Sequence, residues 1–170
     1  MRKPILLALI LPLLLLTSLK AQQSTVVNKL PNDFLHFFLG DWTGDGEFAS
    51  GRKISANLSF KLTSDSSWIQ YQHTDKLPNT YKALSLWGID NQTGQFVAFI
   101  FDKGNRKFVS NGWVDDKLIL THIGNSSTGP VFQHFKYEKS SDTSFKMTFE
   151  TSKDGISWKL IDYLIFTKEQ

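Results

Sequence analysis

The chain has 170 residues, no cysteine and 14% aromatic residues, including 14 Phe and 5 Trp. The lack of cysteine excludes disulfide bonds and a cysteine-linked lipid anchor, so a hydrophobic core must stabilise the fold unaided. The formal charge of +3 comes from Arg2, Lys3 and Lys20, because the other 16 basic and 16 acidic residues balance, and the composition therefore predicts no nucleic-acid partner.

The first 21 residues have the layout of a secretory signal peptide. A basic head at 1–3 precedes an apolar run at 5–16, and Ala21 is the small residue before the expected cleavage point. The apolar run is shorter than the ~20 residues that cross a membrane, so a stable membrane anchor is not expected. We expect export to the periplasm or the extracellular space, with 1–21 removed and 22–29 forming a polar leader.

A short helix is predicted just before the first strand. Over residues 30–39, four apolar residues recur at helical spacing. These residues are Leu30, Phe34, Phe37 and Phe38. Asn32 or Asp33, which follow Pro31, are the expected N-cap, and Gly40 is expected to end the helix.

From Asp41 onward, apolar and polar residues alternate with a period of two, as in strands with one buried face. Clusters of Gly, Asn, Asp and Ser separate the alternating segments and predict tight turns. The predicted strands cover 41–48, 54–63, 66–73, 81–89, 95–102, 107–114, 117–123, 131–139, 145–150 and 157–167.

Short links between strands favour antiparallel pairing of sequence neighbours, and closing the sheet removes its exposed edges. Residues 30–170 are therefore predicted to form one all-β domain, a single up-and-down antiparallel β-barrel of about ten strands with a short N-terminal helix. A two-sheet sandwich is the alternative.

The segment GDWTGDGEF, residues 40–48, places Trp42 and two glycines on one face of the first strand. A phosphate-binding loop would need a helix after the glycines, whereas a strand is predicted there. We expect Trp42 to point into the barrel, with Gly44 and Gly46 leaving room beside it or allowing the strand to curve.

A helical entry, a Gly-x-Trp motif at the first strand and an antiparallel barrel together resemble the calycin group, which includes the lipocalins. Within this group the chain is similar to an uncharacterised bacterial family of calycin-like domains. The matching segments are 39–42, 87–102, 112–118 and 152–158. The resemblance implies that Trp42, after Gly40, packs under a basic residue of the last strand and closes one end of the barrel, and Lys168 is the matching residue.

Gly40, Trp42, Gly44 and Gly46 also resemble the Gly-x-Trp-x-Gly-x-Gly opening of the nitrobindins, which are ten-stranded barrels that hold haem. This resemblance implies a haem- or nitric oxide-handling protein as an alternative. The nitrobindins ligate the iron through a histidine near the end of the chain. The last predicted strand contains no histidine and offers only Tyr163 as an iron ligand of another kind.

The charged and histidine residues form no catalytic motif or metal-ligand spacing, so no metal site is expected and catalysis is not indicated. Lys103, Arg106 and Lys107 are interpreted as a solvated turn. On neighbouring strands, His122 and His134 could both point inward and meet across the lumen, which would favour a small isomerase or hydrolase as a further alternative.

Polar side chains accompany large aromatic residues on several predicted strands, a composition typical of small-molecule pockets. On 66–73, Gln70 lies on one face and Tyr71 on the other, and the alternation leaves open which face is inside. The lumen candidates are Trp42, Gln70, Tyr71, His73, Trp87, Trp113, His122, His134 and Tyr163. The sequence predicts an exported, non-catalytic protein that binds a small apolar or amphipathic molecule without a cofactor. Filling of the barrel by aromatic side chains is the alternative, and ligand identity and oligomeric state stay open.

Overall fold

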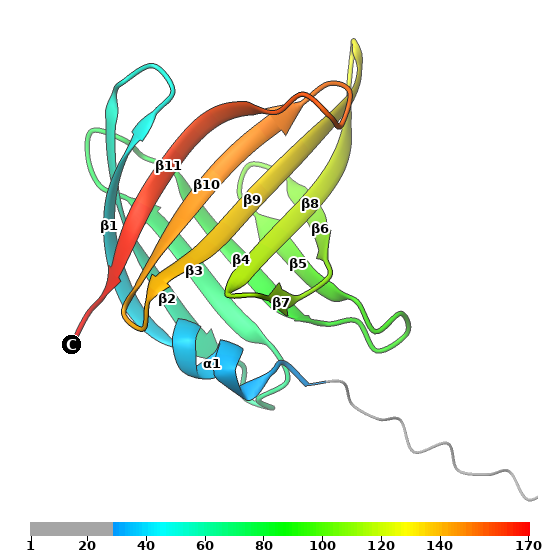
Figure 1. The fold of residues 1–170 in the computed structure, drawn as a ribbon. Coiled ribbons are helices and arrows are strands. Elements are labelled where there is room, and N and C mark those ends of the chain that lie inside the picture. Colours follow the sequence, from blue (N-terminus) through cyan, green and yellow to red (C-terminus); the bar gives the residue numbers. More distant parts are fainter. Residues whose placement is uncertain (1–28) are drawn as a thin grey trace, which may run out of the picture.

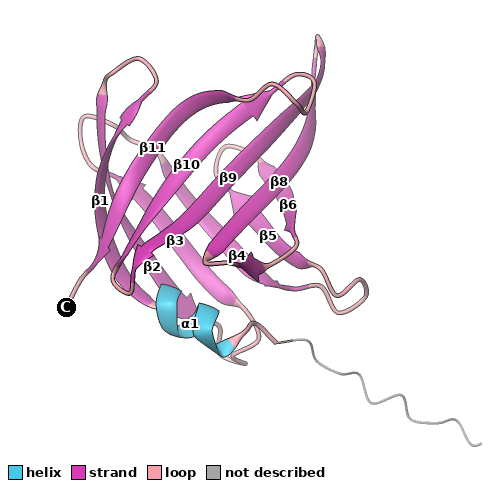
Figure 2. Ribbon diagram, viewed as in Figure 1, coloured by secondary structure: helices cyan, strands magenta, loops and turns pink. Residues whose placement is uncertain are grey.

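The structure is a computed structural model that describes residues 29–170 (Figure 1). The expected signal peptide and residues 22–28 of the leader lie outside the described residues. Strands make up almost all of the secondary structure (Figure 2). The elements are α1 (Asn32–Phe38), β1 (Gly40–Phe48), β2 (Lys53–Leu62), β3 (Ile69–Asp75), β4 (Lys82–Ile89), β5 (Phe96–Phe101), β6 (Asn105–Ser110), β7 (Trp113–Val114), β8 (Lys117–Ser126), β9 (Gly129–Ser141), β10 (Ser144–Ser152) and β11 (Lys159–Lys168). No helix in this part of the chain is long and apolar enough to cross a membrane.

The strands form one antiparallel sheet in which sequence neighbours pair in order, and β1 pairs with β11. A further pairing, Val109 of β6 opposite Thr121 of β8, closes the sheet into a ring. The two-residue β7 pairs with β8 at one end and is not part of the ring. The predicted closed up-and-down barrel of ten strands is confirmed, and the sandwich alternative is wrong.

Several strand boundaries differ from the prediction, and two of the differences change the shape of the barrel. The strand predicted at 107–114 is interrupted because Gly112 adopts a φ of +90°, and its N–H donates to Ser110 Oγ. The turn predicted over 124–130 is only two residues long, since Ser126 still pairs with Gly129 across the β8–β9 hairpin. This hairpin therefore extends further beyond the barrel than the sequence predicts.

Helix α1 lies against one end of the barrel (Figure 1) and fills it with aromatic side chains. The four residues that predict the helix are all buried: Leu30, Phe34, Phe37 and Phe38. The predicted N-cap is wrong, because Pro31 occupies that position and no side chain caps the helix. The other end of the barrel, where the β1–β2, β3–β4, β5–β6, β8–β9 and β10–β11 hairpins turn, is here called the mouth.

Trp42 and Lys168 join α1 to the first and last strands. Trp42 is fully buried on the inner face of β1, and its Nε1–H donates to the Phe38 carbonyl oxygen at 2.8 Å. Lys168, its cross-strand partner, has its Nζ 5.3 Å from the Trp42 ring and donates to the carbonyl oxygens of His36 and Phe37. A cation at a helix C-terminus is favourable, so this contact fixes α1 over the end of the barrel.

The two glycines of β1 allow β11 to approach closely. A Cβ atom at Gly44 would lie 2.4 Å from the Phe166 ring, and one at Gly46 would lie 1.8 Å from the carbonyl oxygen of Tyr163. Any side chain at these positions would occupy space that β11 already fills. The glycines are therefore required by the packing of the closing strand pair.

Candidate functional site

A cavity of about 240 Å³ lies in the half of the barrel nearer the mouth. Its lining residues come from the mouth-side halves of the strands, and most of them are apolar. The apolar lining includes Ile54, Ile100, Phe135, Met147, Phe149 and Leu164. The cavity is slightly smaller than the ~300–1,000 Å³ pockets that bind drug-sized molecules, so it fits a small ligand.

Tyr71 and Tyr137 form the boundary between the cavity and the aromatic core above α1. Both side chains are almost completely buried, and Tyr71 stacks on Phe60 with ring centroids 4.5 Å apart. Burial raises the pKa of both phenols, so they stay neutral hydrogen-bonding groups. The core end of the cavity is therefore closed and presents hydroxyl groups.

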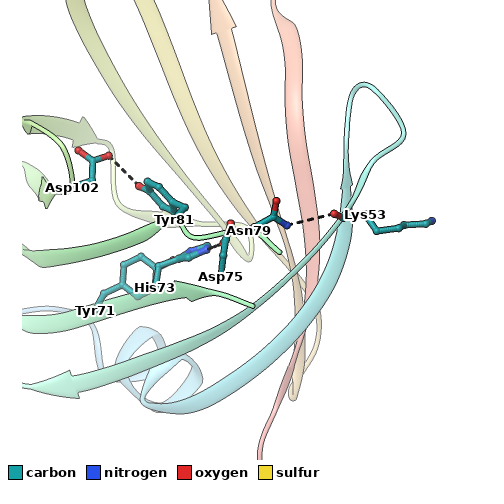
Figure 3. Close-up of polar contacts among 7 residues, drawn as sticks. All are labelled: Lys53, Tyr71, His73, Asp75, Asn79, Tyr81 and Asp102. Atoms are coloured by element: carbon teal, nitrogen blue, oxygen red, sulfur yellow. Dashed lines mark hydrogen bonds and ion pairs between the residues drawn. The ribbon is translucent and has the colours of Figure 1, made fainter. Parts of the chain in front are cut away.

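A chain of hydrogen bonds runs along the inner face of β3 toward the mouth (Figure 3). The Tyr71 hydroxyl lies 3.1 Å from His73 Nδ1, and His73 Nε2 lies 2.8 Å from Asp75 Oδ1. A neutral imidazole satisfies both contacts when Nε2–H donates to Asp75 and Nδ1 accepts from Tyr71. Both ring nitrogens of His73 are thereby occupied.

Arg106 enters the cavity from β6, which corrects its interpretation as part of a solvated turn. Its guanidinium forms an ion pair with Asp102 and donates to Gln133 Oε1 at 2.9 Å. The Tyr81 hydroxyl donates to the same Asp102 carboxylate at 3.1 Å (Figure 3). Partial burial acts to raise the pKa of Asp102, but the Arg106 charge and these hydrogen bonds outweigh it, and the pKa is lowered.

Asp162 lines the cavity on β11, between its cross-strand partners Phe48 and Phe149. Within residues 29–170, no hydrogen bond or ion pair reaches its carboxylate. Burial, with a smaller effect from the negative charge of Asp75, raises the pKa of Asp162 to about 6. Of the two carboxylates in the lining, Asp75 has a hydrogen-bond partner in His73, whereas Asp162 has none among the described residues.

Asp162→Asn is expected to stabilise the protein at neutral pH. The folded protein holds the Asp162 proton more tightly than the unfolded chain, whose pKa is near 3.8, so stability from this group is lost as pH rises from about 4 through about 6. The variant should raise the free energy of unfolding by about 1–2 kcal/mol at pH 7.5 and by about 0 at pH 4, allowing for partial exposure. Urea denaturation at both pH values measures this.

The control for this experiment is Asp41→Asn, which removes the same charge from an exposed position on the outer face of β1. An equal gain from the control would show that the effect comes from net charge rather than from the cavity. A loss of stability in Asp162→Asn at pH 7.5 would contradict the prediction.

The structure places two of the lumen candidates, Tyr71 and His73, in the cavity lining. Three others lie on the outer face of the barrel. Gln70 alternates with these inward residues and so faces out, and the Tyr163 ring lies 4.9 Å from Lys146 Nζ outside the barrel. His134 stacks on Trp158 with ring centroids 3.4 Å apart.

The alternative in which the two histidines meet across the lumen is wrong. His134 pairs with Thr121, whereas His122 pairs with Gln133, so the two imidazoles lie on opposite faces of the sheet. The His122 ring packs 5.1 Å from the Phe108 ring, and its Nδ1 lies 2.8 Å from the Lys107 carbonyl oxygen. His122 therefore fills the gap where β6 and β8 separate.

The three tryptophan candidates belong to the packed core rather than to the cavity. Trp42 and Trp87 are fully buried, and the Trp87 Nε1–H donates to Ser85 Oγ at 2.8 Å. Trp113 packs on the helix, with its ring 5.3 Å from that of Phe38. The interior of the α1 half of the barrel is thus filled by aromatic side chains, and the 240 Å³ cavity lies in the mouth half.

The lumen candidates from the sequence do not include three charged groups of the site: Asp75, Arg106 and Asp162. Asp75 was missed because the predicted strand ended at residue 73, although Ile69, Tyr71 and His73 continue to it in the same alternation. Extending that alternation by two residues would have found it. Arg106 gave no such signal, since a charged residue after a turn is most often exposed.

No protein-family model matches the chain, and no curated protein sequence matches it. Among solved structures it is similar to the crystal structure of Rv2717c from M. tuberculosis, with a TM-score of 0.57 and 11% sequence identity over 84% of this chain and 100% of that one. At this identity the similarity shows the fold alone. The fold is a closed antiparallel barrel.

Two further solved structures match at lower TM-scores. They are EF1p2_mFAP2b bound to DFHBI, with a TM-score of 0.40, 13% identity and coverage of 79% and 94%, and a redesigned β-barrel, b11L5F_LGL, with a TM-score of 0.35, 16% identity and coverage of 79% and 92%. These scores are too low to support a conclusion about this chain. The calycin-like and nitrobindin resemblances therefore stay predictions.

Proposed function

We propose that the protein binds a small amphipathic molecule in the cavity of its barrel, without catalysis. The observation that carries this proposal is a cavity with an apolar interior and charged groups at one end. An apolar body would pack against residues such as Phe135 and Leu164, while a polar group would meet Asp75, Arg106 or Asp162. Pockets of this composition take most of their affinity from apolar burial and their orientation from a few polar contacts.

The difference between the two ends of the barrel supports entry of the ligand through one end, the mouth. Helix α1 and its aromatic side chains fill one end, and the cavity lies behind hairpins at the other. The enclosed Tyr71 and Tyr137 hydroxyls limit how deeply a ligand can enter. The ligand would therefore enter through the mouth and place its apolar part first, leaving its polar part near the charged groups.

We also propose that this binding takes place outside the cytoplasm. The basic head, the apolar run and Ala21 support export, and a chain without cysteine folds without help from an oxidising compartment.

The residues of the cavity do not fit a haem. The imidazole of His73 is engaged on both sides, and the hydroxyls of Tyr71 and Tyr137 are neutral, whereas these residue types ligate haem iron through a free nitrogen or a phenolate. Met147 also lines the cavity, but a methionine thioether ligates haem together with a histidine, and His73 is not free to be that partner. Tyr163, the ligand considered from the sequence, points out of the barrel. Haem handling is therefore not the function that this cavity favours.

Ala83→Phe tests the proposed function by filling the cavity. Ala83 lines the cavity on β4, whereas Leu84, the next residue, lies on the outer face of the same strand. The probe is 3-phenylpropan-1-ol, and calorimetry measures its affinity. We expect Ala83→Phe to weaken binding by about tenfold or more, because the new ring would occupy the volume that the probe needs.

Leu84→Phe is the matched control and should bind the probe within about twofold of the unmodified protein, as expected for an outer-face substitution. Equal binding by Ala83→Phe and the unmodified protein would show that the probe binds elsewhere. Failure of the unmodified, folded protein to bind the probe or its amine and carboxylate analogues would overturn the proposed function.

A further inference from the structure

We infer that the polar part of the ligand is a protonated amine and that Asp162 is the residue that binds it. This inference rests on the proposed function and narrows it from amphipathic molecules to cationic ones. It depends on the charges in and around the cavity, on the contacts that each already makes, and on the position of Asp162 among aromatic side chains.

The charges at the cavity do not balance. Three carboxylates lie at or beside its lining, from Asp75, Asp102 and Asp162, and one guanidinium lies there, from Arg106. Arg106 is paired with Asp102, and the imidazole N–H of His73 satisfies Asp75. Among the described residues, Asp162 is left as the carboxylate without a hydrogen-bond or ion-pair partner, facing a space large enough for a small ligand.

A partly buried carboxylate without a partner lowers the free energy of unfolding. Removing a charge from water is unfavourable unless a partner replaces the water. Nothing in the packing requires the charge of Asp162, since its neighbours across the sheet are Phe48 and Phe149. A bound cation would supply the missing partner. The unfavourable burial of Asp162 is therefore explained if a bound cation is its partner.

The surroundings of Asp162 favour an ammonium group over a simple metal cation. Within residues 29–170, no group of three or more metal-ligating side chains is positioned to hold an ion. Phe149, stacked on Phe135 with centroids 4.5 Å apart, borders the site on β10. Phe48 borders it on β1, and one face of its ring already contacts the Arg52 guanidinium at 4.2 Å. Aromatic faces beside a carboxylate suit an alkylammonium, which has both a charge and an apolar body.

An anionic ligand fits the same cavity poorly. The guanidinium of Arg106 already has Asp102 and Gln133 as partners, so an incoming carboxylate would have to displace one of them. It would also lie near Asp75 and Asp162, whose charges repel it. We therefore expect the cavity to discriminate among an amine, an alcohol and a carboxylate that share one apolar skeleton and differ in their polar group.

The test compares 3-phenylpropan-1-amine, 3-phenylpropan-1-ol and 3-phenylpropanoate at pH 7.5, where the amine is protonated. Calorimetry on the unmodified protein should show that the amine binds about tenfold or more tighter than the alcohol, as expected for a charge-assisted hydrogen bond, and that the carboxylate binds weakest. In Asp162→Asn the affinity for the amine should fall to that for the alcohol, while affinity for the alcohol is retained.

Asp41→Asn serves as the control, because it removes one negative charge far from the cavity and should keep the preference for the amine. Equal affinities for amine and alcohol in the unmodified protein, or a preference that survives in Asp162→Asn, would overturn the inference while leaving the proposed function intact. If the folded protein binds none of the three probes, both the inference and the proposed function fail. Circular dichroism of each variant shows that loss of binding is not loss of fold.

Discussion

Gly46→Ala is expected to destabilise the barrel by about 3 kcal/mol or more, or to prevent it from folding. The new Cβ atom would lie 1.8 Å from the carbonyl oxygen of Tyr163 and 2.7 Å from the Leu164 Cα atom. Both are backbone atoms of β11, so no side-chain rotation can relieve the overlap. The two strands would have to separate at the pairing that joins the ends of the sheet. Urea denaturation followed by tryptophan fluorescence measures the loss.

Gly104→Ala is the matched control, because a Cβ atom there has no neighbour within 4 Å. Its effect on the free energy of unfolding should be within about 0.5 kcal/mol, as for other surface substitutions. If Gly46→Ala were as stable as this control, then β1 and β11 would not pair as closely as described, and the barrel would be open at that point.

Phe38→Ala is expected to cost about 3–5 kcal/mol, the range for removing a large buried aromatic side chain. The Phe38 ring lies at the centre of the aromatic core between α1 and the barrel, within 6.1 Å of seven other rings, and it is fully buried. The surrounding rings are rigid, so the resulting space cannot collapse completely. The loss would be a large part of the ~5–15 kcal/mol that stabilises a typical domain.

The control for this substitution is Phe101→Ala, on the outer face of β5, where the side chain is 41% exposed. It should lower the free energy of unfolding by no more than about 2 kcal/mol, since about two-fifths of the side chain already lies in water. Equal losses for the two variants would mean that α1 is not held against the barrel, because Phe38 would then be no better packed than a surface residue.

The architecture could be predicted from the sequence because its strands carry a strong local signal. In β2, every second residue from Ile54 to Phe60 is buried, and short polar links leave sequence neighbours no economical alternative to pairing with one another. Closure follows from the same local information, since a sheet of so many short strands would otherwise expose two edges. The fold could therefore be predicted from patterns within single strands.

Predicting the residues that line the cavity would have required information that no single strand contains. The segment predicted as a strand at 66–73 has Trp68 on one face and Tyr71 on the other, so side-chain size did not distinguish inside from outside. In the structure Trp68 precedes β3 and covers the backbone of Gly88 outside the barrel. Strict alternation would place Trp158 and Asp162 on the same face of the sheet. The pairing of β10 with β11 shifts its register between Phe149 and Glu150, and this shift separates the two residues. Trp158 consequently stacks outside, on His134, while Asp162 faces the cavity.

The pairing of β1 with β11 has a consequence for the order of events in folding. At this seam, the hydrogen bond from Lys168 Nζ to the His36 carbonyl oxygen joins residues 132 positions apart in the sequence. Each hairpin, in contrast, joins strands that are neighbours in the sequence. A hairpin can form as soon as its two strands are free to pair, but the ring can close only when the last strand is also present. Until then β1 and β10 each present a free edge to other chains. Non-local closure of this kind is slow, in the range of milliseconds to seconds for β-barrels, so the newly made protein is most exposed to aggregation just before it is complete.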